Sequence, residues 1–313
     1  MWPYICCCGV TYFHFYSAFV RIESKLKKTA LISLILGSLL AVALTGCSEK
    51  SEPLQLVVFA AASDVALGTA RIPLNIQVID GTRFDDRAEE LEVTYTSPTS
   101  NETHVVDDLT WRAWPVRSGT YTSTMTFDEV GLWSIKVRIK ADKGSIPAGS
   151  GILVKSATDA PNIGDPAPLT ATKIEPTDGN LRSITSAPNP DPDLYSISFD
   201  DAVESGNPTV ITFSTPAYCQ SATCGPQTEV LSALDDKYNG QASFIHVEIF
   251  DNPEEMLAAG DPSLGIESPV IHEWEFHTEP WTFVVDGAGT VIGRFEAFAT
   301  QSEIEEYLVP TLR

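Results

Sequence analysis

The chain has 313 residues, of which 43% are hydrophobic, and its formal net charge is −22. That length suits two ordinary domains, and the hydrophobic content is that of a folded protein. An acidic surface repels phosphate backbones, so we expect no nucleic acid among the partners. It also disfavours flat docking on anionic lipid headgroups. Composition therefore narrows the class of partner, but it predicts no particular reaction.

The first 46 residues carry the pattern of an export signal. A lysine cluster at 25–28 precedes an uncharged apolar run at 30–44. That run has about 15 residues, fewer than the roughly 20 that a membrane-spanning helix needs. It ends in Leu44-Thr45-Gly46-Cys47, which resembles the bacterial lipobox. The resemblance implies a lipid on Cys47 that holds the protein at the extracytoplasmic face of the cell membrane. The alternative is an ordinary signal or anchor helix that ends near a cysteine.

Residues 1–24 fit poorly in front of such a signal, because they hold Cys6, Cys7, Cys8 and many aromatic side chains. A start codon assigned too far upstream would account for them, with Val20 as the candidate start. The alternative is metal binding, but three adjacent cysteines cannot easily converge on one ion without further ligands. We therefore interpret 1–46 as an N-terminal extension plus a lipoprotein signal peptide.

The chain after this signal is strongly acidic and poor in cysteine. Residues 1–46 hold four of the 20 basic and one of the 42 acidic residues, so the remainder carries a formal charge of −25. Beyond Cys47 its only cysteines are Cys219 and Cys224. In an exported protein, two cysteines five positions apart favour a disulfide.

Residues 47–53 read as a short polar tether, and residues 54–156 have an all-β pattern. Apolar and polar side chains alternate in four runs separated by Gly, Pro and Asp turns: 71–80, 91–96, 121–127 and 133–140. Short alternating strands with regular turns predict a β-sandwich. The stretch 118–133 resembles the late strands of immunoglobulin-like domains, which implies an all-β immunoglobulin-like sandwich over 54–156.

Three tryptophans stand in this β-rich region: Trp111, Trp114 and Trp133. They could form a binding face, but large aromatic side chains contribute most often to cores. We therefore expect them to pack in or near the interior of the sandwich.

Residues 157–206 are rich in Pro, Asp, Ser and Thr, most plainly at 187–193. Such a composition predicts a linker or a lead-in that runs along the surface of the next domain. The piece Gly164-Asp165-Pro166-Ala167-Pro168 resembles the opening of redoxin-type domains. The second domain could therefore begin before its first core strand.

From residue 207 to the end, strands and helices alternate. We expect strands at 208–213, 242–250, 281–286 and 291–295, the last two joined by a hairpin at 287–289. Helices are expected at 227–238, opened by Gly225-Pro226, at 253–259, at 269–274, and from a Thr300 or Ser302 cap to about Leu308.

This order, together with three local motifs, resembles the thioredoxin fold over 207–313. Cys224-Gly225-Pro226 matches the start of the thioredoxin Cys-Gly-Pro-Cys. Glu279-Pro280 matches the cis-proline that faces the active cysteine, and Val285-Asp286-Gly287 matches the end of the sheet. The nearest group is the membrane-anchored TlpA-like redoxins. The resemblance implies an α/β thioredoxin-like domain after the sandwich.

The chain also departs from that family. Gln227 stands where the second cysteine is expected, and Cys219 lies upstream instead, which gives Cys-x4-Cys. A second alignment makes Cys219 the nucleophile, but the Gly-Pro helix start favours Cys224. Thr212 occupies the place of a buried acid. Glu279 would disfavour a nearby thiolate, whereas a helix N-terminus would favour it.

The resemblance implies extracytoplasmic thiol–disulfide exchange on a protein thiol or disulfide. Cys224 would attack, Cys219 would resolve, and the backbone at Pro280 would hold the substrate chain. No cofactor is implied, because the sulfurs themselves carry the electrons.

Two other interpretations stay open. The pair could be a structural disulfide, worth roughly 2 kcal/mol on the loop-entropy model, in a non-catalytic binding or scaffold lipoprotein. Alternatively, two thiolates and a histidine, His272 or His277, could bind copper(I) as in Sco-like chaperones. The Sco pattern has Cys-x3-Cys, which this chain lacks.

Overall fold

The computed structural model describes residues 54–114, 119–141 and 146–312. Residues 1–53 lie outside this range, and with them the predicted extension, signal peptide, lipid anchor on Cys47 and tether. In the described residues, no helix combines the length and the apolar character needed to cross a membrane. The chain from Pro53 to Arg313 forms one compact unit.

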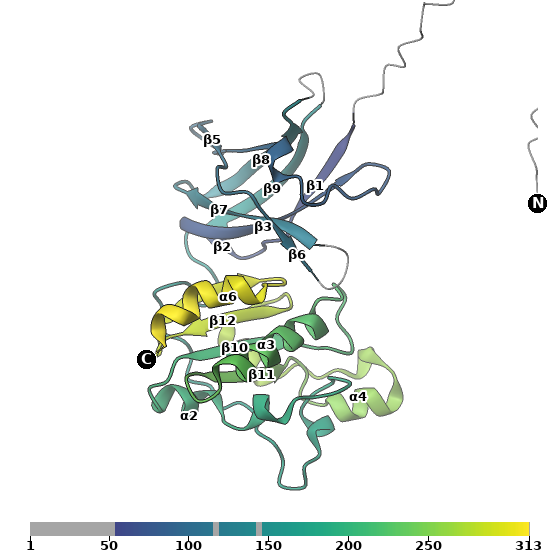
Figure 1. Ribbon diagram of the computed structural model, residues 1–313, viewed down its shortest axis with the longest axis vertical. Helices are drawn as coiled ribbons and strands as arrows, with labels where there is room; N and C mark the ends of the chain where they lie inside the picture. The colour runs from purple at the N-terminus through teal and green to yellow at the C-terminus, as the bar shows by residue number, and fades with distance from the viewer. Residues whose placement is uncertain (1–53, 115–118, 142–145, 313) are drawn as a thin grey trace, which may run out of the picture. The chain divides into compact units, whose positions relative to one another are not determined.

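The first half of this unit consists of two β-sheets (Figure 1). Neighbouring strands are antiparallel, except that β2 and β9 run parallel. One sheet has the order β1 (Leu56–Ala60), β3 (Gly68–Val78), β7 (Gly119–Phe127) and β6 (Thr110–Ala113). The other has the order β2 (Val65–Ala66), β9 (Ala148–Lys155), β8 (Gly131–Ile139), β4 (Leu91–Thr96) and β5 (Thr103–Val105).

Alternation along the strands places one set of side chains in a shared core. In β8, Trp133, Ile135 and Val137 are fully buried, while the residues between them are exposed. Side chains of both sheets join the same apolar cluster. The prediction of a β-sandwich from period-two patterning is therefore confirmed. The sequence did not predict β9, because Gly149 and Gly151 interrupt its pattern.

Trp111 and Trp133 pack with the sandwich core as expected, whereas Trp114 lies against Phe298 of the second half. Trp133 has no exposed surface, and its indole N–H donates to the Glu129 carbonyl at 2.8 Å. Trp111 packs against the core and meets the Tyr121 ring edge-on, with centroids 4.9 Å apart. Trp114 is partly buried.

Residues 157–206 pack against the second half and do not form an extended linker. Gly164 and Ala167 donate backbone hydrogen bonds to the hairpin carbonyls of Val291 and Gly289. Further on, two 3-10 turns and one short helix form, and Leu194, Tyr195, Phe199 and Ala202 among their side chains are buried. The elements are Leu181–Ser183, Pro192–Tyr195 and α2 (Phe199–Glu204). The lead-in interpretation therefore describes this segment better than the linker interpretation.

The second half contains a four-stranded sheet between two groups of helices (Figure 1). Strand β10 pairs in parallel with β11 and antiparallel with β12, and β13 is antiparallel to β12. The strands are β11 (Ser243–Glu248), β10 (Thr209–Ser214), β12 (Trp281–Val285) and β13 (Val291–Glu296). The helices are α3 (Cys224–Tyr238), α4 (Pro253–Ala259), α5 (Pro269–Trp274) and α6 (Gln301–Leu308).

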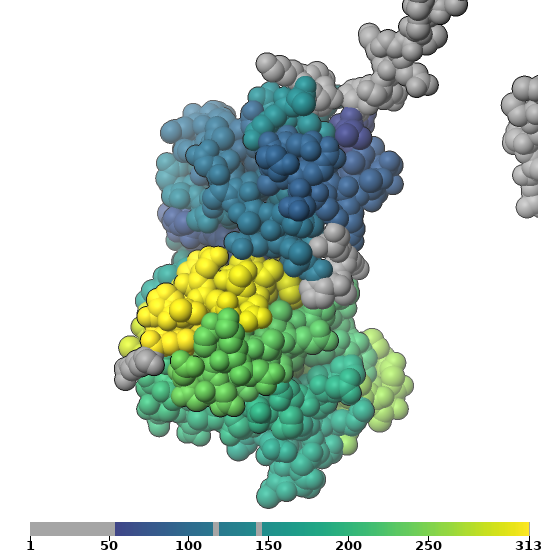
Figure 2. Space-filling model, in the orientation of Figure 1, coloured from purple at the N-terminus to yellow at the C-terminus, as the bar shows by residue number. Residues whose placement is uncertain are grey.

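The two faces of this sheet bury different side chains. Ile211 and Phe213 of β10 belong to one apolar cluster, which also contains Trp274 of α5. Val210 belongs to the opposite cluster, with Leu231 of α3 and Ile304 of α6. Helices α3 and α6 adjoin at the molecular surface (Figure 2). The predicted strands and helices of this half are confirmed, and α4 and α5 have the predicted bounds.

Candidate active site

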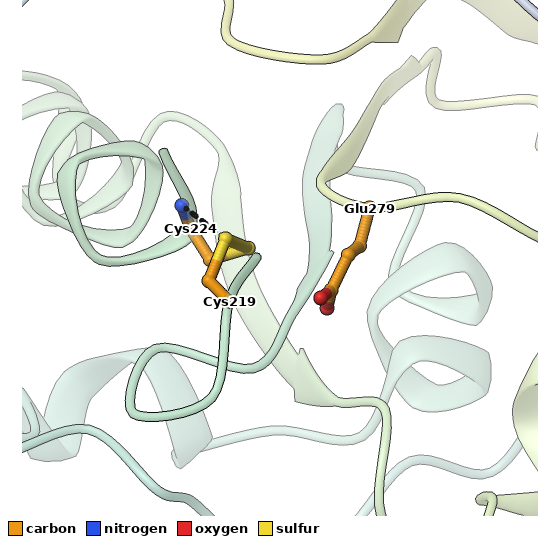
Figure 3. A group of neighbouring side chains, drawn as sticks. All are labelled: Cys219, Cys224 and Glu279. Atoms are coloured by element: carbon orange, nitrogen blue, oxygen red, sulfur yellow. Dashed lines mark hydrogen bonds between the residues drawn. A yellow bond between two sulfur atoms is a disulfide. The ribbon is translucent and has the colours of Figure 1, made fainter. Parts of the chain in front are cut away.

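The two cysteines meet at the point where a buried strand leads into a helix. Strand β10 ends at Ser214, a loop follows, and α3 begins at Cys224. Cys219 in this loop and Cys224 form a disulfide with their Cα atoms 5.8 Å apart (Figure 3). The Cys224 backbone N–H donates to Cys219 Sγ at 3.2 Å, and Ser221 Oγ lies 3.2 Å from the same sulfur. The disulfide predicted from spacing is thus formed at a helix N-terminus.

The two cysteines differ in exposure. Cys224 has no exposed surface, whereas Cys219 is partly exposed. An incoming thiolate attacks a disulfide along the line of the two sulfurs and must reach the one it attacks. Access therefore favours attack at Cys219, with Cys224 as the leaving sulfur.

The side chain of Glu279, from the segment that leads into β12, lies beside the disulfide (Figure 3). Its peptide bond to Pro280 is cis, as the sequence resemblance implies, and Pro280 is buried directly before β12. A carboxylate oxygen of Glu279 and the Sγ atoms of Cys219 and Cys224 all lie within 4.8 Å of one another. The three predicted site residues and Glu279 are therefore neighbours in space.

The environment of Glu279 favours its neutral form. Burial raises the pKa of its carboxyl to about 7, the negative charge of Glu248 acts in the same direction, and the backbone N–H of Thr215 opposes both. Its Oε2 atom is buried and has no hydrogen-bond partner. Near neutral pH this carboxyl can therefore either donate or accept a proton.

The sheet face beneath α3 becomes polar toward the disulfide. It starts with apolar side chains, including Val210, and ends with buried polar ones at the strand termini. Cross-strand pairing places Thr212 opposite both His246 and Thr282, and Ser214 opposite Glu248. The threonine hydroxyls of 212 and 282 lie 3.0 Å apart.

A chain of hydrogen bonds connects this polar face to α3. His246 Nδ1 lies 2.6 Å from the Tyr195 hydroxyl, and its Nε2 lies 2.9 Å from Ser214 Oγ. Ser214 Oγ lies 3.2 Å from Thr228 Oγ1, which donates to the Cys224 carbonyl at 3.0 Å. Buried polar groups need such partners, and here they fix the first turn of the helix that carries Cys224.

Burial disfavours the charged form of the two ionisable side chains on this sheet face, His246 and Glu248. It lowers the pKa of His246 to about 4. It raises the pKa of Glu248, although that carboxylate accepts the Ser186 N–H at 2.8 Å. The sequence analysis did not single out His246 or Glu248. The available signal was two ionisable side chains inside an otherwise apolar strand.

The remaining candidates lie elsewhere. Gln227, at the position of the second cysteine in the thioredoxin motif, is buried. Its Oε1 accepts a hydrogen bond from the Ala299 N–H at 2.8 Å, so this side chain has a structural contact. His272 and His277 are exposed, and in the described part of the chain neither joins Cys219, Cys224 and Glu279 in a cluster of candidate metal ligands. The copper interpretation requires one of these histidines beside the two cysteines, and the described residues do not bring one there.

A groove of about 590 Å³ opens beside the disulfide. It reaches from the cysteine loop to the segment before the cis bond. Its lining combines apolar and polar side chains, among them Gln220, Phe250, Ile271, Phe276 and Glu279.

Comparison with known proteins gives little. No family model matches the chain, and no curated protein matches it. Among solved structures, the filamin domain of Lin-41 matches 34% of this chain and all of its own length, at 13% identity and a TM-score of 0.23. So low a score carries no argument about fold or function.

Proposed function

We propose that residues 207–313, with their lead-in, form a thioredoxin-like domain that exchanges thiols and disulfides through Cys219 and Cys224. The support is the order of elements, with a parallel β10–α3–β11 unit followed by the β12–β13 hairpin and α6. A cysteine at the start of α3 and a cis-proline before β12 are the local features that the resemblance requires. The β-sandwich before it is proposed to be immunoglobulin-like.

The single observation that carries the activity is the asymmetry of the disulfide. Cys219 is partly exposed and its sulfur receives hydrogen bonds at a helix N-terminus, whereas Cys224 is fully buried. A helix N-terminus and donated hydrogen bonds stabilise a thiolate. We therefore assign the attacking role to Cys219 and the resolving role to Cys224, which reverses the assignment that the Gly-Pro motif favoured.

The substrate in this proposal is a cysteine-containing protein segment that lies in the groove. The anchor is lipid on Cys47, which holds the domain at the extracytoplasmic face of a membrane. Such a location is oxidising enough for disulfide chemistry to persist.

The test of the activity is the reduction potential of the Cys219–Cys224 pair, titrated with glutathione or dithiothreitol in the folded protein. A reversible couple well above about −300 mV is the expected result. A pair that is reduced only after denaturation would overturn the proposal and leave a structural disulfide in a binding or scaffold lipoprotein.

The assignment of roles has its own test. In Cys224→Ser the remaining Cys219 should be alkylated rapidly by iodoacetamide and should form a stable mixed disulfide with glutathione. In Cys219→Ser the remaining Cys224 should react far more slowly, because it is buried. Equal rates, or the opposite order, would restore Cys224 as the attacking cysteine.

A further inference from the structure

The buried sulfur of the pair has a proton-transfer partner within reach. When the disulfide opens at Cys219, the electron pair of the broken bond stays on Cys224 Sγ. This atom is shielded from solvent, and a bare thiolate in an apolar environment is disfavoured. A proton donor beside it would stabilise the products of the step.

We propose that Glu279 is the general acid and base for Cys224 during exchange, an inference that rests on the proposed function. Its carboxylate oxygen lies within 4.8 Å of both sulfurs, close enough for transfer through one intervening water or after a small side-chain rotation. Its Oε2 atom is buried and unpartnered. Because this oxygen has no hydrogen-bond partner and lies near the disulfide, the carboxyl can give a proton to a sulfur or take one from it.

The reaction balances as follows in the direction that reduces the pair. A substrate thiolate attacks Cys219 Sγ, the Cys219–Cys224 bond breaks, and a mixed disulfide forms on Cys219. The leaving Cys224 sulfur takes the proton of the Glu279 carboxyl, which yields a thiol and a carboxylate. A second thiolate of the same substrate then displaces Cys219, so that the substrate is oxidised to a disulfide and the pair gains two electrons.

In the reverse direction, the Glu279 carboxylate removes the Cys224 proton. The resulting thiolate attacks the mixed disulfide and re-forms the Cys219–Cys224 bond. The same carboxyl therefore serves both directions, and the assignment is independent of which one predominates.

Other ionisable groups lie near Glu279. Glu248 on β11 raises the pKa through its charge, and burial raises it further, to about 7. Glu267 and His277 line the same groove. A pH dependence assigned to Glu279 must therefore be separated from theirs by substitution.

The experiment compares the rates at which dithiothreitol reduces the oxidised wild-type protein and the Glu279→Gln variant between pH 5 and pH 9. The ratio of the two rates cancels the ionisation of the reductant. We expect the wild type to be faster by roughly 10²-fold at pH 5–6, where the carboxyl is protonated. The ratio should fall toward one above pH 8, with a midpoint near 7. Glu279→Asp should retain part of the advantage, and Glu229→Gln, a control at an exposed carboxyl of α3 outside the groove, should match the wild type at every pH.

The outcomes separate the two proposals. A pair that dithiothreitol cannot reduce in folded wild type removes the proposed function. A pair that exchanges normally, with a wild-type to Glu279→Gln ratio that does not change with pH, removes the role of Glu279 alone. If circular dichroism shows that Glu279→Gln does not fold, the test uses the wild-type protein alone. Its reduction rate at each pH is then divided by the fraction of dithiothreitol present as thiolate. The resulting values must fall through a midpoint near pH 7, and a flat profile contradicts the proposal.

Discussion

The interior of the β-sandwich and the α3 face of the C-terminal sheet are both buried, but they differ in chemistry. The sandwich core is made of aliphatic and aromatic side chains from two sheets, and its Tyr121 hydroxyl and Trp133 N–H are bonded to backbone carbonyls. The sheet beneath α3 instead buries Thr212, His246 and Glu248 among other polar groups.

This difference separates stability from function. Apolar burial contributes roughly 25 cal/mol per Å² and has no directional requirement. Burying a histidine or a glutamate costs free energy unless every polar atom has a hydrogen-bond partner. Ionisable residues that are buried near a reactive group therefore indicate a functional role more than a contribution to stability. The polar face lies at the strand ends that meet the disulfide, whereas the interior of the sandwich is a single apolar cluster.

The largest expected effect is a loss of stability from a substitution in the apolar core of the sandwich. Trp133→Ala removes a fully buried ring that lies 5.1 Å from Phe127 and 5.7 Å from Tyr95, measured between centroids. We expect the free energy of unfolding, measured by urea titration, to fall by about 3–5 kcal/mol. The exchange rate of the folded protein should stay unchanged.

The control for this variant lies at the next position of the same strand. Leu132 is 66% exposed, so Leu132→Ala should change the free energy of unfolding by less than about 0.5 kcal/mol. A similar loss in both variants would mean that the sandwich core does not supply the stability assigned to it.

The second expected effect is a pH-dependent change in the free energy of unfolding, and it comes from His246 on the polar sheet face beneath α3. The pKa of His246 is lowered to about 4 in the folded protein, below the value of about 6.5 expected in the unfolded chain. As the pH falls below 6.5, the unfolded chain binds the proton first, so this contribution to stability is complete above pH 6.5 and is lost toward pH 4. The loss amounts to about 3 kcal/mol at pH 4.

His246→Gln should remove that dependence, because the amide can contact Tyr195 and Ser214 but does not titrate. The measurement is the difference in unfolding free energy between wild type and variant from pH 7 to pH 4. Contributions of Glu248 and Glu279, whose raised pKa values act in the opposite direction, cancel in this difference. A difference that stays constant with pH would show that His246 is not held neutral by burial.

The same comparison explains what could be predicted from the sequence. Alternation in the sandwich predicted β4 with its observed bounds, because a half-buried strand leaves a period-two pattern in its own residues. The cysteine pair and the cis-proline were found through short local motifs. Elements without such a local pattern, such as the glycine-containing β9, were not found.

The polar network could not be predicted, because its geometry depends on contacts between distant segments. His246 bonds to Ser214 and Tyr195, which lie 32 and 51 residues away in the sequence. The roles of the two sulfurs likewise depend on which one tertiary packing covers. The Gly-Pro motif locates the start of α3, but it does not say that Cys224 is buried there.

The smallest expected effect tests a polar contact that the sequence partly predicted. The analysis left Thr300 and Ser302 as alternative caps of α6, and the structure assigns the N-cap to Thr300 in a capping box with Glu303. The Glu303 N–H donates to Thr300 Oγ1 at 3.3 Å, and Glu303 Oε2 accepts the Thr300 N–H at 2.9 Å.

Thr300→Ala removes one half of this reciprocal pair and should lower the free energy of unfolding by about 1 kcal/mol. Thr300→Ser keeps the hydroxyl and should leave it nearly unchanged, so the difference between the two variants isolates the cap from the loss of a methyl group. Equal losses would indicate that packing at α6, and not the hydrogen bond, fixes the helix start. The expected unequal losses would mean that the hydrogen bond from the Glu303 N–H to the Thr300 hydroxyl fixes the start of α6.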